Sequence, residues 1–188
     1  MKAFLLTLLL PLIATALSGL PPIGAEIPQS MLAIDSFLTL QTQTKILTLD
    51  FRGGIKERVD VNPDDPINSV RLRVVGFRLT AESPDGNIVL EQNDVDEAPK
   101  SQLRLVQRFP PKYEHINVID VSLKIESEGG KPLVLAYKEP LVMKGSLTQY
   151  PARGDLYQLL KPVEFVDLKN PDLVIATLDK LPAKRGGL

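Results

Sequence analysis

The chain contains no cysteine and no tryptophan, and its 188 residues include a single histidine, His115. The absence of cysteine excludes disulfides, thiol catalysis, cysteine-based metal sites and a lipid-modified amino-terminal cysteine. A metal site built on two histidines is impossible within one chain, and a Ser-His-Asp triad would have to use His115. No Gly-x-Ser-x-Gly turn occurs after residue 25. These absences predict a protein that is not an enzyme and needs no cofactor.

Paired carboxylates are the remaining catalytic option. Asp64 and Asp65 are adjacent, and Asp94, Asp96 and Glu97 cluster in one segment. Two carboxyl groups across a cleft would suit a glycosidase, but such clefts usually also present aromatic platforms. With no tryptophan and only four scattered tyrosines, a carboxylate-dependent hydrolase is the least favoured alternative. We expect His115 at the mouth of a sheet, where a strand begins.

The first 25 residues have the pattern of a secretory signal peptide. Lys2 is their only charge, an apolar run follows it, and small residues come next. Two small-x-small sites offer cleavage, Ala14-Thr15-Ala16 and Ile23-Gly24-Ala25, and the second is favoured because Pro21 and Pro22 precede it. An uncleaved anchor is the alternative, since Ala3 to Leu20 spans 18 residues.

The predicted export and the absence of disulfides together favour a location in a bacterial envelope. The chain has no Asn-x-Ser/Thr sequon, and small secreted eukaryotic domains usually carry disulfides. Residues 26–188 suit one domain, and loss of Lys2 changes the net charge from −1 to −2. A near-neutral chain gives no reason to expect a nucleic acid partner. We therefore expect a secreted or periplasmic protein with no membrane span after cleavage near Ala25.

Strand-like alternation dominates the rest of the chain. Val70, Leu72 and Val74 share one face, whereas Phe77, Leu79 and Ala81 have the opposite parity, so the sequence predicts a β-bulge at Gly76. Gly53-Gly54 reads as a hairpin turn. Further runs continue to residue 178, and Lys184 to Leu188 reads as a frayed tail.

One short helix is predicted near residues 155–161. Asp155 and Gln158 imitate a capping box, and Leu156, Leu159 and Leu160 fall on one helical face. The remaining pattern gives roughly ten short strands with frequent turn signals and no strand–helix alternation. The predicted fold is an all-β, antiparallel β-sandwich, with a barrel-like variant as the alternative.

Arginines on the polar faces of two strands are the candidate binding residues. If the strands at 70–82 and 102–109 are neighbours, they form a basic stripe of Arg71, Arg73, Arg78, Arg104 and Arg108. The planar guanidinium suits carboxylates and phosphates, so an anionic glycan or lipid headgroup could bind there. The alternative is an ordinary solvent face whose arginines pair with acids such as Glu57, Glu82 and Glu91.

The acidic segment is also a weak candidate for calcium. Asp94, Asp96 and Glu97 supply hard oxygen donors. The Asp-x-Asp-x-Asp-Gly pattern is missing, however, and no glycine provides the sharp turn. A solvated loop explains these residues equally well.

Taken together, the sequence predicts an exported, non-catalytic β-domain that binds or assembles. The first hypothesis is an interaction module that binds a protein partner or itself through a sheet face or an edge strand. The second is a binding domain for an anionic glycan or lipid through the arginine-rich face. No family resemblance is specific enough to name.

Overall fold

The computed structural model describes residues 19–41, 45–84, 86–126 and 130–186. Within these ranges every regular element is a β-strand. The strands are β1 (Glu26–Leu40), β2 (Lys45–Val61), β3 (Ser69–Ser83), β4 (Gly86–Gln92), β5 (Ser101–Arg108), β6 (Pro111–Ile119), β7 (Val121–Ile125), β8 (Leu133–Tyr137), β9 (Leu141–Leu147), β10 (Asp155–Leu159), β11 (Val163–Asp167), β12 (Asn170–Lys180) and β13 (Ala183–Arg185). The predicted all-β antiparallel fold is confirmed. No helix with the length and apolarity of a membrane span occurs among the described residues.

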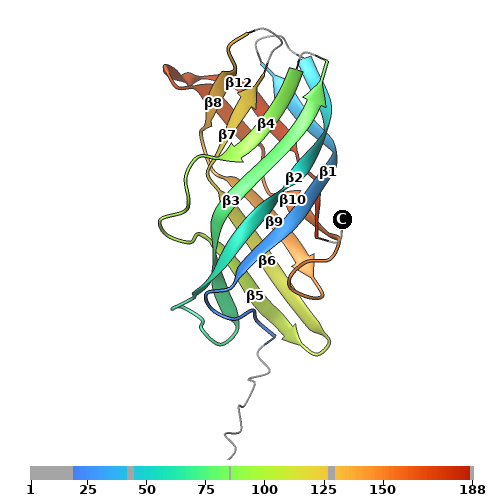
Figure 1. The fold of residues 1–188 in the computed structure, drawn as a ribbon, viewed down its shortest axis with the longest axis vertical. Helices are drawn as coiled ribbons and strands as arrows, with labels where there is room; N and C mark the ends of the chain where they lie inside the picture. Colours follow the sequence, from blue (N-terminus) through green and yellow to red (C-terminus); the bar gives the residue numbers. More distant parts are fainter. Residues whose placement is uncertain (1–18, 42–44, 85, 127–129, 187–188) are drawn as a thin grey trace, which may run out of the picture.

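The thirteen strands form one ring-like sheet, so the barrel-like form describes the fold (Figure 1). The long strands β1, β2 and β3 run the length of the ring and belong to two closed circuits. In the upper half of Figure 1, β3 continues through β4, β7, β8, β11 and β12 back to β1. In the lower half, β3 continues through β5, β6, β9, β10 and β13 back to β1.

The two circuits arise because five long strands are interrupted near their middle. Each interrupted strand has one part in each half: β4/β5, β6/β7, β8/β9, β10/β11 and β12/β13. Pro140, Pro162 and Pro182 lie at three of these breaks, where a residue without an N–H cannot extend the ladder. With the three unbroken strands, the molecule is an eight-membered antiparallel meander closed on itself.

Closure leaves each described strand with a neighbour on both sides. A free sheet edge for strand addition is therefore not available among the described strands, and a partner would have to use the outer face or an end of the ring.

The interior differs between the two halves. In the upper half it is apolar, and side chains such as Phe51, Leu79 and Phe165 are fully buried. Burial of each such side chain stabilises the fold by about 1.5–3 kcal/mol. In the lower half, inward positions carry Glu57 of β2, His115 of β6 and other polar groups.

The helix predicted near residues 155–161 is wrong, because residues 155–159 form strand β10. Tyr157 is fully buried whereas Leu156 is 46 % exposed, which is a period of two rather than a helical face. Strands β9 and β13 on either side pair with the backbone of β10. The Asp155 carboxylate accepts a hydrogen bond from the Arg153 N–H at 3.0 Å instead of capping a helix.

The structure also tests two predictions made from glycines. The bulge at Gly76 is confirmed, since Lys56 pairs with Gly76 but Glu57 pairs with Val74. The hairpin turn at Gly53-Gly54 is wrong, because β2 runs straight through both residues. A Cβ on Gly53 would lie 2.0 Å from the carbonyl oxygen of Arg78. The missing side chain allows β2 and β3 to approach each other there.

Residues 19–25, which belong to the predicted signal peptide, are part of the folded body. The Gly24 N–H donates to the Val59 carbonyl at 2.8 Å, and the Val59 N–H donates to the Ala25 carbonyl at 2.9 Å. Leu20 packs against the core, and the Tyr113 hydroxyl donates to the Gly19 carbonyl at 2.5 Å. The apolar run before residue 19 and the Ala14-Thr15-Ala16 site lie outside the described residues.

Candidate functional site

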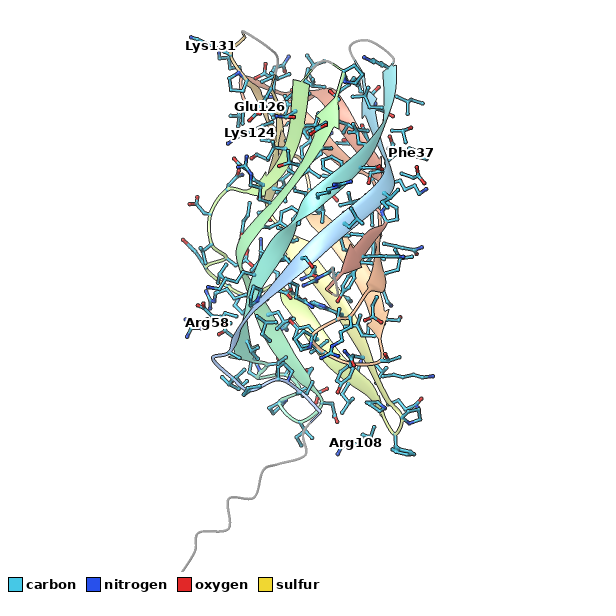
Figure 2. The ribbon with its side chains drawn as sticks, turned by 45° about the vertical axis from the view of Figure 1, so that its right-hand side comes forward. Phe37, Arg58, Arg108, Lys124, Glu126 and Lys131 are labelled. Atoms are coloured by element: carbon cyan, nitrogen blue, oxygen red, sulfur yellow. The ribbon has the colours of Figure 1, made fainter. Side chains whose placement is uncertain are left out.

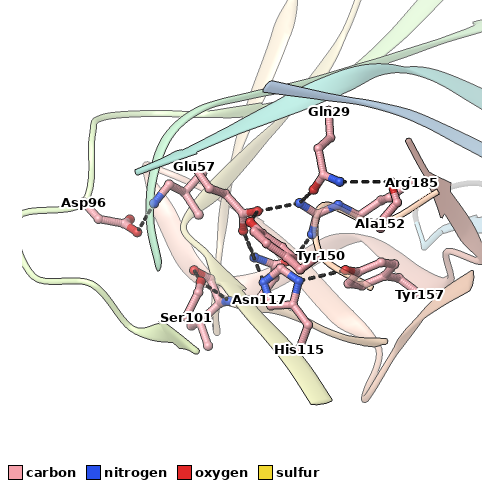
Figure 3. A network of polar contacts seen from close by, with 12 residues as sticks. Gln29, Glu57, Asp96, Ser101, His115, Asn117, Tyr150, Ala152, Tyr157 and Arg185 are labelled. Atoms are coloured by element: carbon pink, nitrogen blue, oxygen red, sulfur yellow. Dashed lines mark hydrogen bonds and ion pairs between the residues drawn. The ribbon is translucent and has the colours of Figure 1, made fainter. Parts of the chain in front are cut away.

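The lower half of the ring encloses a cluster of polar side chains, which we call the interior network (Figure 3). Its members come from five inward-facing positions on strands β1, β2, β6 and β10, from the short strand β13, and from the β9–β10 loop. They are Gln29, Glu57, His115, Asn117, Tyr150, Tyr157 and Arg185. Glu57, His115, Tyr157 and Arg185 are fully buried.

An ion pair between Glu57 and Arg185 forms the centre of the network. Arg185 Nη2 donates to Glu57 Oε2 at 2.6 Å and to Gln29 Oε1 at 2.7 Å. Asn117 links the two charges, because its amide oxygen accepts from Arg185 Nη1 and its nitrogen donates to Glu57 Oε1 at 2.5 Å. The Tyr150 hydroxyl donates to Glu57 Oε2 at 3.0 Å. Each charge therefore has an opposite charge and further hydrogen-bond partners, while Arg185 Nε has no hydrogen-bond partner among the described residues.

The pair stays charged despite its burial. Burial by itself raises the pKa of Glu57, but Arg185 and His115 beside it more than offset this effect and hold that pKa well below its usual value. Burial by itself lowers the pKa of Arg185, but the nearby Glu57 carboxylate more than offsets this effect and raises that pKa above its usual value. The two opposite charges make the buried pair neutral overall.

His115 links the ion pair to Tyr157. Its Nδ1 lies 2.7 Å from the Tyr157 hydroxyl, and its Nε2 lies 3.3 Å from Glu57 Oε1 without the alignment of a hydrogen bond. Burial is the largest influence on His115 and lowers its pKa below the usual value, so the ring is neutral near pH 7. We assign the proton to Nε2, because a lone pair there would face the Glu57 carboxylate; Nδ1 then accepts from Tyr157.

Gly145 provides the space in which Tyr157 lies. It pairs with His115 on one side and with Tyr157 on the other, so the three residues lie on adjacent strands. A Cβ on Gly145 would lie 2.8 Å from the Tyr157 ring. The Arg185 guanidinium lies 4.6 Å from the centre of the same ring, a cation–π contact. Burial raises the pKa of Tyr157 far above its usual value, so its hydroxyl stays protonated.

The network has the components of acid–base chemistry but no access for a substrate at its centre. Glu57, His115 and Arg185 have no exposed surface. Its direct role is to join β1, β2, β6, β10 and β13 from inside the ring. This placement does not match the expectation for His115, which lies within β6 rather than at the mouth of the sheet.

Gln29 and Tyr150 extend from the network to the outer surface. Both line a hollow of about 450 Å³, which we call the polar hollow. Its other lining residues are Pro28, Ser30, Gln149, Pro151, Ala152, Arg153 and Gly186. The polar hollow is therefore a solvent-facing site whose floor is fixed by buried charges.

The structure brings some of the five predicted arginines together. Strands β3 and β5 pair directly, with Ser69 opposite Arg104 and Arg71 opposite Gln102, so Arg71 and Arg104 lie on neighbouring strands. Arg108 lies at the far end of β5, at the bottom of Figure 2. Arg78 lies beyond the bulge in the upper half and pairs with Glu91 at 2.7 Å.

Besides Arg78, two more of the five arginines are engaged in ion pairs. Arg71 pairs with Asp64 at 2.9 Å, and Arg73 pairs with Asp60 at 2.9 Å while also donating to the Asp96 and Glu97 carbonyls. A continuous free stripe is therefore not formed, and among the described residues only Arg104 and Arg108 of the five form no ion pair.

Among the weak calcium candidates, the Asp96 carboxylate bonds to groups that hold the loop in place and not to the other two acids. The Asp96 carboxylate accepts from the Val74 N–H at 3.1 Å and from Gln92 at 3.4 Å. Burial is the main cause that raises its pKa, which disfavours the charged form. Asp94 and Glu97 line the same surface hollow as Asp96. Among the described residues, no group of three or more histidine or acidic side chains is placed to hold a metal ion.

Sequence reasoning missed the two central residues of the network. Glu57 does not lie on the solvent face: it shares its parity with Ile55 and Val59, and that parity is the signal that it faces inward. Arg185 was placed in a frayed tail, and three residues of strand give no usable period. Tyr150 lies in a loop and carries no pattern at all.

The fold and this interior define an all-β protein with a ring-like sheet. A solved structure with the same fold is DynF from the dynemicin biosynthesis pathway of Micromonospora chersina, with a TM-score of 0.70 and 16 % identity. The match covers 89 % of this chain and 82 % of DynF. At this identity the likeness establishes the fold alone. No family model and no curated protein sequence matches the chain.

Proposed function

We propose that this chain is an exported binding protein without catalytic activity, and that it attaches to an anionic lipid surface through the lower end of the ring. We call this surface the basic end; it comprises the β5–β6 hairpin tip and the β2–β3 loop. The observation that carries the proposal is Phe109, which is 91 % exposed at the hairpin tip. The basic residues Arg108 and Lys112 flank it in the same tip.

The apolar part of the basic end consists of neighbouring segments. Ile67 in the β2–β3 loop is 70 % exposed, and Val106 in β5 is 55 % exposed. The loop and the hairpin are joined, because Arg108 Nη2 donates to Asn68 Oδ1 at 3.1 Å and the Leu105 N–H donates to the Asn68 carbonyl at 2.7 Å. Large exposed apolar side chains beside cations are typical of surfaces that insert into a membrane interface.

The charge of the basic end complements an anionic membrane. Within the described part of the chain, Arg104, Arg108 and Lys112 form no ion pair. Of the two acids in the β2–β3 loop, Asp64 pairs with Arg71, whereas Asp65 keeps its charge and its Oδ1 accepts from the Asn68 N–H. Each free cation at an anionic lipid surface contributes about 1 kcal/mol of attraction.

The position of the amino-terminal segment supports the same orientation. Gly19 lies against Tyr113, which directly follows Lys112 in β6. Gly19 and Leu20, the described end of the apolar segment, therefore lie near the basic end. An uncleaved segment would itself hold the basic end at the membrane. After cleavage, attachment would depend on the exposed side chains of the basic end.

Vesicle co-sedimentation tests the proposal. We expect the mature protein to bind phosphatidylglycerol vesicles, to bind phosphatidylcholine vesicles weakly, and to lose affinity as salt increases. Arg108→Ser with Lys112→Ser should weaken binding by about thirtyfold, from two cations at about 1 kcal/mol each. Phe109→Ser should weaken it separately, because it removes the inserted ring.

Leu168→Ser with Lys169→Ser is the matched control. Leu168 is 70 % exposed at the β11–β12 turn in the other half of the ring, and Lys169 follows it. This control should bind like the parent. Equal binding to both lipids, or basic-end variants that bind like the parent, would overturn the proposal.

A further inference from the structure

We infer that the polar hollow binds an acidic sugar, with Arg153 pairing its carboxylate. The hollow is separate from the basic end: it lies beside β1, the β9–β10 loop and Gly186. Its volume of about 450 Å³ lies within the range of small-molecule sites, roughly 300–1,000 Å³. The argument rests on how its floor is held, on its apolar surfaces and on its charge.

The floor is preorganised by the interior network. Gln29 is 7 % exposed, and its amide oxygen accepts from Arg185 while Nε2 reaches the Ala152 carbonyl at 3.4 Å. The Tyr150 hydroxyl donates a hydrogen bond to the buried Glu57 carboxylate, which fixes the tyrosine ring beside the hollow. Both side chains are thereby held in place before any ligand arrives, which reduces the entropy cost of binding.

The remaining lining suits a sugar ring. Pro28 and Pro151 are exposed and Tyr150 is half-buried, so rigid apolar surfaces are available for the C–H face of a sugar. Ser30 and Gln149 add a hydroxyl and an amide that can bond to sugar hydroxyls. A few polar groups converging beside apolar surfaces are the usual composition of a small-molecule site.

The charge of the hollow selects an acid. Arg153 is the one charged side chain that lines it among the described residues, and no carboxylate does. Asp155 lies near but is engaged, because its Oδ2 accepts from the Arg153 backbone N–H at 3.0 Å. Arg153 itself is exposed, and a guanidinium binds a carboxylate through two parallel hydrogen bonds.

A titration followed by two-dimensional ¹H–¹⁵N NMR tests the site. We expect glucuronate to cause saturable shifts at the amides of residues 28–30 and 149–153. Arg153→Gln should weaken this binding at least tenfold. Arg52→Gln removes an exposed arginine of β2 and, as the matched control, should leave it unchanged. Gln149→Ala, an exposed position that threatens no core contact, should weaken binding while preserving the rest of the spectrum.

Two further ligands make the result decisive. Glucose tests the role of the carboxylate and acetate tests the role of the sugar, and both should bind much more weakly than glucuronate. Equal shifts with glucose would overturn the specificity for an acid. Equal shifts with acetate would show that the hollow recognises only a carboxylate and would overturn the specificity for a sugar. The absence of saturable shifts with glucuronate would overturn the inference altogether.

Discussion

Arg185 and Glu57 are 128 positions apart in the chain and form an ion pair at 2.6 Å inside the ring. The pair connects β13 to β2, so it joins the strand that closes the lower circuit to one of the three unbroken strands. Since neither side chain is exposed, loss of one partner leaves the other charge buried without compensation.

Removal of Arg185 should therefore be more damaging than removal of the whole pair. We expect Arg185→Met to lower the free energy of unfolding by about 3–5 kcal/mol. The double variant Arg185→Met with Glu57→Leu should cost less than Arg185→Met alone, and therefore less than the sum of the two single changes. Urea unfolding followed by far-ultraviolet circular dichroism measures all three. Additive effects would mean that the two charges do not stabilise each other.

Gly145→Ala should destabilise the fold by displacing Tyr157. The added methyl group would lie 2.8 Å from the Tyr157 ring, and overpacking of this kind costs about 1–3 kcal/mol. Tyr157→Leu in the same chain should recover part of the loss. Gly76→Ala is the control, since its nearest neighbour is Lys56 Cβ at 4.0 Å. Thermal unfolding that shows equal losses for both alanine variants would contradict this packing account.

The stability of the protein should decrease as the pH falls below about 6.5, the pKa of histidine in an unfolded chain. Burial lowers the pKa of His115 in the folded state, so the unfolded chain takes up a proton that the folded chain refuses. The free energy of unfolding then falls by at most about 1.4 kcal/mol per pH unit. The lowered pKa of Glu57 acts later: its contribution is present above about pH 4.3 and is lost as the pH falls below that value.

His115 is the only histidine in the chain, so His115→Gln isolates its contribution. Urea unfolding at pH 7.5, 6.5 and 5.5 should give a smaller pH slope for this variant than for the parent, whatever its absolute stability. The ring protons of His115 in an NMR titration give the folded-state pKa directly. A pKa at or above 6.5 would refute the explanation.

The packing of residues 19–25 bears on the proposed cleavage of the amino-terminal segment. Cleavage after Ala25 would remove the Gly24–Val59 and Tyr113–Gly19 hydrogen bonds and the packed side chain of Leu20. Cleavage after Ala16 keeps all of them. If the chain is exported as we propose, we therefore expect the mass of the processed protein to correspond to a chain that begins at Leu17. A chain that begins at Glu26 would contradict this expectation, and an intact amino terminus would favour the anchor.

The sequence by itself determined the all-β character of this protein. Alternation along the chain predicted strands, and the change of parity between Val74 and Phe77 located the bulge, because side-chain direction in a strand depends only on local position. The absence of cysteine excluded disulfides, and that inference needs only the composition of the chain. Such inferences need no knowledge of which strands meet.

Only the tertiary structure decided how the strands close and what they enclose. Closure into a ring set Glu57 against Arg185, and it placed Gly145 beneath Tyr157. Local pattern cannot show such pairs, because a buried charge is tolerated only where a partner from a distant segment compensates it. The helix predicted at Asp155–Lys161 was wrong for a related reason: the neighbouring strands β9 and β13, and not local propensity, supplied its backbone hydrogen bonds.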